Sequence, residues 1–215
     1  MQEDVNDIKL AGAKLGEHRH VCAFFHSQDE EYRVLLPFIL DGINNGEKAF
    51  HIVDPKLALD HRERLNQAGI DPTDLEENKQ LEIRVWEQAY LRSNGCFDQN
   101  DMLELIQEVL KTGKQEGFPM TRLVAHMEWA CENRQGVDDL VEYEARLNTV
   151  LPHHHDPVIC TYDLAKFNAG TVIDILRTHP MVIIGGILQD NPFYIPPEEF
   201  LQELAARRAA SALTE

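Results

Sequence analysis

The turn after the first apolar run of the chain sets the tightest limit on what it can fold into. Val21-Cys22-Ala23-Phe24-Phe25 is continuously apolar, which is typical of a strand buried on both faces of a parallel sheet. The following Ser27-Gln28-Asp29-Glu30 has the capping-box pattern that opens a helix. A phosphate-binding loop would need glycines and a lysine at this turn, and neither is present. The sequence therefore predicts an α/β protein without a P-loop, and no NTPase activity.

Strand-like and helix-like segments alternate about six times along the chain. This alternation predicts a mostly parallel central sheet with helices on both faces. Asp54-Pro55 is predicted to cap a helix that runs to Gly69. The period-two pattern of Leu81-Glu82-Ile83-Arg84-Val85 predicts a half-exposed strand near a sheet edge. The other expected strands are 49–53, 123–127, 158–162 and 181–184, and the other expected helices are 98–111, 138–150, 168–178 and one beginning at 197.

One folded domain is expected, because the chain shows no internal repeat and no linker-like segment. Residues 1–17 have no clear pattern and are expected to form a flexible lead-in. The domain itself is assigned to residues 18–203, and residues 204–215 are expected to be a helical or frayed tail.

Composition excludes several kinds of partner. The net charge of -17 opposes direct binding to nucleic acid and to anionic membrane surfaces. The four cysteines are widely spaced, and the acidic N-terminus has no apolar core of a signal peptide. We therefore expect reduced thiols and a cytoplasmic location.

Aromatic and polar residues gather where several expected strands end. Because ligands of open α/β sheets bind beyond the carboxyl ends of the strands, these residues are candidates for ligand binding. Each also has a structural alternative: a capped turn, core packing, or for Glu128 an ion pair with Arg122 or Arg134. The candidates are Phe25, His26, Ser27, Glu128, Trp129 and Tyr162.

The ten histidines raise the question of a metal. His20 and Cys22 would share one face of a strand, and His51 or His126 on neighbouring strands could complete a metal or haem site. The adjacent His153-His154-His155 cannot all face one ion on a regular element. Hydrogen-bonded, partly buried imidazoles are the commoner arrangement, so no metal and no cofactor is assigned. No catalytic residue is assigned either, because neither a nucleophile elbow nor a dinucleotide fingerprint is present.

The chain resembles the MEDS family, the methanogen/methylotroph DcmR-like sensory domains, over about residues 18–203. The motifs that carry the resemblance occur in order along the chain. They are His20-Val21-Cys22-Ala23-Phe24-Phe25, Leu36-Pro37-Phe38 with Gly42 and Gly46-Glu47, Glu128-Trp129-Ala130, Tyr143-Glu144 with Leu147-Asn148, Cys160-Thr161-Tyr162-Asp163, His179-Pro180, Asn191-Pro192-Phe193-Tyr194 and Pro196-Pro197-Glu198-Glu199-Phe200-Leu201.

The resemblance implies a three-layer RecA/KaiC-like core that has lost its phosphate loop, and a sensory role proposed for small hydrocarbon derivatives. Family members are often fused to histidine kinases or helix-turn-helix domains, and only about a dozen residues follow residue 203 here. The residues at family-motif positions are His20, Glu47, Glu128, Tyr162 and His179.

Three hypotheses for function follow, and residual NTPase activity is the fourth and least favoured. The first is a stand-alone, non-enzymatic sensory domain that binds a small, mostly apolar organic ligand and relays to a separate regulatory protein. The second is an interaction or scaffold protein with an inert core. The third is a metal- or haem-linked sensor using His20, Cys22, His51 or His126. A homodimer is possible under each of them, although no heptad pattern requires one.

Overall fold

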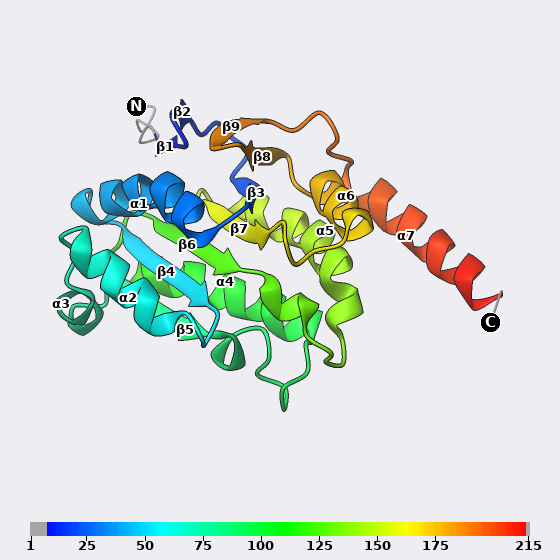
Figure 1. Ribbon diagram of the computed structural model, residues 1–215, viewed down its shortest axis with the longest axis horizontal. Coiled ribbons are helices and arrows are strands. Elements are labelled where there is room, and N and C mark those ends of the chain that lie inside the picture. The colour runs from blue at the N-terminus through cyan, green and yellow to red at the C-terminus, as the bar shows by residue number, and fades with distance from the viewer. Residues whose placement is uncertain (1–7, 214–215) are drawn as a thin grey trace.

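A seven-stranded sheet forms the centre of the computed structural model, which describes residues 8–213 (Figure 1). The strand order is β5-β4-β6-β7-β3-β8-β9. The first six strands in this order run parallel, and β9 pairs antiparallel with β8. The strands are β3 (His20–Phe25), β4 (Lys48–Val53), β5 (Leu81–Val85), β6 (Thr121–His126), β7 (Val158–Asp163), β8 (Met181–Ile184) and β9 (Ile187–Asp190). The mostly parallel sheet and the edge position of β5 are confirmed.

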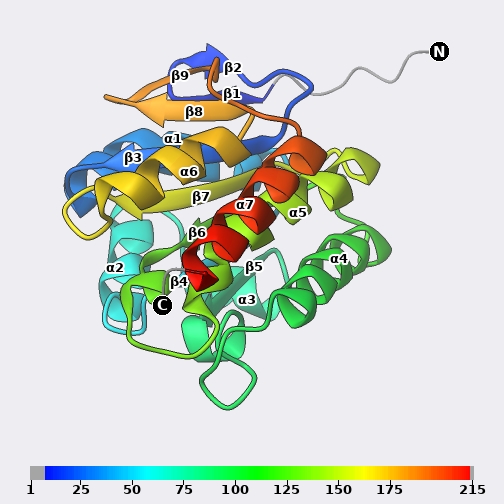
Figure 2. The same cartoon turned by 90° about the vertical axis from the view of Figure 1, so that its right-hand side faces the viewer.

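Helices cover both faces of this sheet (Figures 1 and 2). The first face carries α1 (Gln28–Asn44), α2 (Ala58–Gln67) and α3 (Pro72–Glu77). The second face carries α4 (Gln99–Gln115), α5 (Leu140–Val150) and α6 (Ala169–Thr178). The side chains of β3 alternate between the two cores, with Val21 on the first face and Cys22 on the second. The three-layer α/β architecture is therefore confirmed.

The starts of the first two helices differ in how well sequence predicts them. Ser27 is the N-cap of α1, and its hydroxyl accepts a hydrogen bond from the Glu30 amide at 3.3 Å. The expected helix start at Asp54-Pro55 is wrong, because α2 begins at Ala58. The Asp54 carboxylate instead accepts a hydrogen bond from the Lys56 amide at 2.9 Å, which stabilises a turn.

The lead-in is folded where the structure describes it. Residues 8–17 contain a small hairpin of β1 (Lys9–Leu10) and β2 (Ala13–Lys14). Ile8, Leu10 and Leu15 are buried in the core beneath α1. The expectation of flexibility is therefore wrong for residues 8–17, since three well-spaced apolar side chains suffice to dock this segment. Residues 1–7 lie outside the described part of the chain.

The C-terminal helix α7 (Pro197–Ala212) runs through the expected boundary at residue 203 without a break. Phe200 and Leu204 are buried against Ala145 of α5, which anchors the first half of the helix. The second half extends from the body of the protein (Figure 1). Residues 204–213 are therefore mostly helical, and residues 214–215 are outside the described part.

Candidate functional site

A very small cavity lies at the carboxyl ends of the strands. Its volume is about 20 Å³, close to the space of one water molecule, whereas pockets for small organic ligands measure about 300–1,000 Å³. The Glu128 carboxylate accepts a hydrogen bond from the Asp163 amide at 2.9 Å, which ties two strand ends together. Three predicted ligand residues, Phe25, Ser27 and Glu128, do line this cavity.

The other three predicted ligand residues lie elsewhere. Trp129 is fully buried and packs against Tyr90 and Phe97, with ring centroids 4.7 and 4.3 Å apart. Tyr162 is also fully buried and lies in the core beneath α5 and α6. His26 is exposed and does not line the cavity. The structure thus does not bring the six residues together as the walls of one pocket.

The expected ion-pair partners of Glu128 are wrong as well. Arg122 instead binds Glu47 at 2.5 Å and Asp41 at 2.8 Å, and Arg134 binds Glu132. Glu47, which occupies a family-motif position, therefore forms a buried ion pair with Arg122.

A much larger cavity lies at the opposite, amino end of the sheet. Its volume is about 680 Å³, within the usual range for small organic ligands. Apolar side chains share its wall with imidazoles and basic groups, so it suits a molecule with an apolar body and a polar end. The lining residues used below are His20, Asn148, Pro152, His154 and Tyr194.

A buried cluster of four side chains adjoins this cavity at His20. His20 begins β3, Glu144 lies on α5, Cys160 on β7, and His179 directly follows α6. Their ligand-type atoms all lie within 4.8 Å of one another, and all four residues are buried. The Glu144 Oε2 atom is 3.1 Å from His20 Nε2 and 3.3 Å from His179 Nε2.

Electrostatics in this cluster favour an ionised Glu144. Burial alone would raise the pKa of Glu144, but the neighbouring His179 and His20 outweigh burial and hold that pKa below its usual range. Burial and repulsion from His179 lower the pKa of His20. Burial also raises the pKa of the Cys160 thiol well above its ordinary value. The Tyr162 hydroxyl donates a hydrogen bond to Glu144 Oε1 at 2.9 Å. Tyr162, which was predicted to bind a ligand, thus has a partner within the protein core.

The structure does not assemble the metal grouping that the sequence raised as an alternative. His51 and His126 project from the first face of the sheet, whereas His20 and Cys22 project from the second. The Cys22 thiol contacts the Met181 carbonyl at 3.7 Å, and His126 pairs with Glu31 at 3.0 Å. The sequence thus identifies His20 as a candidate ligand but assigns the wrong partners.

Glu144 and Asn148 are among the site residues that sequence reasoning missed, as is Cys160 on β7. Leu140, Tyr143 and Leu147 form the buried stripe of α5, and Glu144 lies within that stripe. A carboxylate on an apolar helix face must find partners in the core, because burying an unpaired charge is costly. A carboxylate within an apolar helix stripe, and the family motifs that contain Glu144 and Asn148, are the sequence signals that could have identified these two residues.

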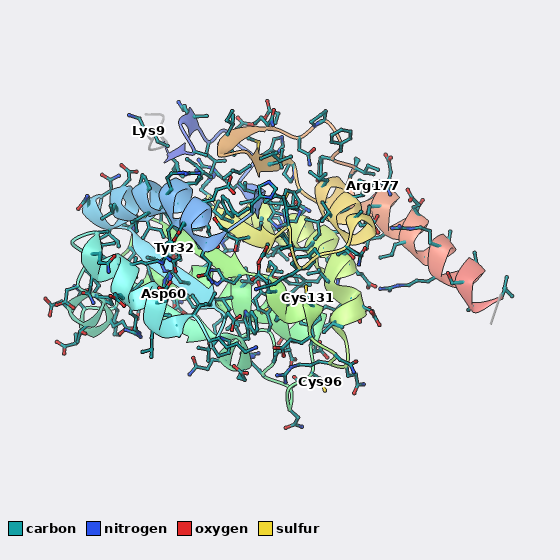
Figure 3. All side chains as sticks on the ribbon, viewed as in Figure 1. Lys9, Tyr32, Asp60, Cys96, Cys131 and Arg177 are labelled. Atoms are coloured by element: carbon teal, nitrogen blue, oxygen red, sulfur yellow. The ribbon has the colours of Figure 1, made fainter. Side chains whose placement is uncertain are left out.

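A second group of histidines lies on the first face, between α1, α2 and β4. The Tyr32 hydroxyl is 2.5 Å from His61 Nδ1, and His61 Nε2 is 2.9 Å from His51 Nδ1. Figure 3 shows Tyr32 and Asp60 where α1 faces α2. Burial lowers the pKa of His51 to about 3 and that of His61 well below its ordinary value. Both imidazoles are therefore neutral near pH 7.

The fold places the chain in the class of RecA/KaiC-like α/β proteins. A KaiC-like protein from Pyrococcus horikoshii OT3 is similar with a TM-score of 0.55 and 17% identity, over 77% of this chain and 70% of that one. The flagellar accessory protein FlaH from Methanocaldococcus jannaschii is similar with a TM-score of 0.51 and 13% identity, over 87% and 82% of the two chains. At these identities the likeness concerns the fold.

The chain belongs to the MEDS family, described as the methanogen/methylotroph DcmR sensory domain, whose model matches residues 19–180. It is 24% identical over 173 residues to the transcriptional repressor DcmR of Methylorubrum extorquens. The match covers 80% of this chain and 62% of that protein, so the chain spans less than two thirds of its relative. These findings support a sensory or signalling role. Among the described residues, no helix combines the length and apolarity needed to cross a membrane.

Proposed function

We propose that this protein is a non-enzymatic sensory domain that binds a small organic molecule in the amino-end cavity. The cavity volume of about 680 Å³ is the observation that carries this proposal, since the carboxyl-end cavity holds only about 20 Å³. The mixed wall favours a small hydrocarbon derivative with one polar group. The site therefore lies opposite the strand ends at which RecA-like relatives are expected to bind phosphates.

A route for the relay to a separate regulatory protein runs from the cavity wall through α5 to α7. His20 and Asn148 both line it, and the His20 Nδ1 atom is 2.9 Å from the Asn148 side-chain oxygen on α5. Helix α5 in turn holds α7, where Arg208 contacts Glu142 at 2.5 Å and Asp139 at 2.9 Å. A ligand that favours one position of α5 would thus change the surface that α7 presents. Similarity to a transcriptional repressor supports a regulatory partner.

Thermal shift against a panel of short-chain alcohols, amines, carboxylates and halogenated hydrocarbons tests the proposal. A panel member at about 100 times its Kd would stabilise the protein by about 2.7 kcal/mol. Pro152→Trp, an exposed wall position, is expected to abolish the shift by filling the cavity. His153→Trp is the matched control, because this exposed neighbour is not part of the wall.

Two outcomes would contradict this assignment. A shift that survives Pro152→Trp but is lost in Ser27→Ala would move the ligand to the carboxyl end. Stabilisation by a purified partner protein, with none by any panel member, would favour the scaffold hypothesis.

A further inference from the structure

Two imidazole nitrogens in the buried cluster, His20 Nε2 and His179 Nε2, face the same oxygen of the Glu144 carboxylate. His179 Nδ1 lies 2.8 Å from the Ile175 carbonyl oxygen. Since a carbonyl oxygen only accepts, Nδ1 carries the proton and, in a neutral ring, Nε2 does not. This Nε2 is fully buried, has no hydrogen-bond partner, and lies 3.3 Å from Glu144 Oε2.

The same deduction holds for His20. The Asn148 amide nitrogen donates to the Thr178 carbonyl at 2.6 Å and to the Glu144 carbonyl at 3.0 Å. The Asn148 oxygen is therefore an acceptor, and His20 Nδ1 must donate to it at 2.9 Å. A neutral His20 then directs its bare Nε2 at Glu144 Oε2, 3.1 Å away.

These lone pairs repel one another unless a positive charge lies among them. The charge can be a proton on an imidazole or a metal ion. Glu144 favours imidazolium while burial disfavours it, and a proton on one ring leaves the second ring's lone pair unused, whereas a metal ion would use all the lone pairs at once. Metal-binding histidines usually donate their second ring N–H to a carbonyl or carboxylate, as both rings do here.

Four of the six separations between the ligand-type atoms are close to the edges of a tetrahedral zinc site, and the other two are within 4.8 Å. Bond lengths of about 2.0–2.1 Å to nitrogen or oxygen and about 2.3 Å to sulfur give edges of about 3.3 Å between N and O and about 3.6 Å to sulfur. The observed N–O separations are 3.1 and 3.3 Å. The Cys160 sulfur lies 3.8 Å from both His20 Nε2 and Glu144 Oε2.

We propose that His20, Glu144, Cys160 and His179 form a closed, four-coordinate zinc site. Two imidazoles, one thiolate and one carboxylate are a ligand set that suits Zn²⁺. Binding displaces the thiol proton of Cys160, and the metal–sulfur bond takes its place. The ion cross-links β3, α5, β7 and the residue after α6, and His20 places it beside the amino-end cavity. This site does not depend on the small-molecule proposal.

Metal content and cobalt substitution test the site. Protein expressed with added zinc is expected to contain one zinc ion per chain, and Co²⁺ exchanged into it is expected to show thiolate-to-cobalt charge-transfer absorption. A chelator is expected to lower the melting temperature of the zinc-loaded wild type. Cys160→Ser and His179→Gln are expected to lose the cobalt band and the response to chelator.

Further variants separate the site from its surroundings. Asn148→Ala removes no ligand but frees the His20 ring, so metal affinity should fall about 10–100-fold. Cys131→Ser is the matched cysteine control, because that thiol is exposed and lies outside the cluster. Replacing His153, His154 and His155 together with glutamine controls for adventitious binding, and both controls should keep one zinc.

The proposal is overturned if zinc-replete wild type contains no metal and shows no cobalt–thiolate band. It is equally overturned if the metal is retained in Cys160→Ser and His179→Gln but lost from the triple glutamine variant. A ligand that stabilises metal-free protein in the thermal-shift panel would leave the sensory proposal standing without the metal.

Discussion

Replacing Arg122 with methionine is expected to lower the free energy of unfolding by about 3–5 kcal/mol, because it leaves a charge buried without a partner. Arg122 is 2% exposed, and its guanidinium binds Glu47, Asp41 and the Phe38 carbonyl. Glu47 is 1% exposed and has no other ion-pair partner among the described residues. Urea unfolding followed by fluorescence of the two tryptophans would measure the loss.

A double replacement separates the ion pair from the packing around it. Arg122→Met combined with Glu47→Leu should cost less than the sum of the two single changes, since no charge is then stranded. Arg62→Ala is the control for a surface pair, because Arg62 and Glu76 are both about one third exposed, and its loss should be below about 1 kcal/mol. Equal losses for Arg122→Met and Arg62→Ala would contradict the expected role of burial.

Acidification is expected to destabilise the protein through histidines that are buried in the neutral form. The pKa of His51 is about 3 when folded, against about 6.5 in an unfolded chain. The unfolded chain therefore takes up a proton first as the pH falls below about 6.5, and stability declines toward about pH 3. His51 alone should remove about 3 kcal/mol between pH 7 and about pH 4.5. His61 acts in the same direction.

The slope of stability against pH tests this expectation. His51→Gln should unfold at a urea concentration that varies less with pH than that of the wild type. His153→Gln alters an exposed imidazole and should leave the slope unchanged. His126 does not affect the slope of stability in this pH range. Burial lowers its pKa, but acidic neighbours led by Glu31 outweigh burial and raise that pKa to about 9. The stability that His126 contributes is therefore fully present below about pH 6.5 and is lost as the pH rises through 9. Parallel curves for wild type and His51→Gln would refute the assignment.

The sheet was readable from sequence because its strands are continuous apolar runs bounded by turn residues. The segment Val158-Ile159-Cys160-Thr161-Tyr162 illustrates this, since it matches β7 to within one residue. The turn at Asp54 was misread because a side-chain bond to Lys56 competes with a helix cap for the same carboxylate. Local patterns cannot decide between two local hydrogen bonds of similar strength.

The candidate site was less predictable because it depends on which face of the sheet each side chain occupies. Position at a strand end suggested that Tyr162 faces a ligand, but its two-residue spacing from Cys160 directs it into the core beneath α5. Cys160 and Glu144 meet only through tertiary packing, 16 residues apart in the chain. His20 was identified as a candidate ligand, yet its partners come from α5, β7 and the end of α6.

The segment that follows the N-terminal hairpin extends the wall of the amino-end cavity beyond the residues that the family model covers. The family model spans residues 19–180. Residues 14–18 and Tyr194 all belong to the wall of the amino-end cavity and fall outside that span. Under the proposed function, ligand recognition would therefore depend in part on segments that the family model does not cover, whereas all four residues of the His20 cluster lie within the span of that model.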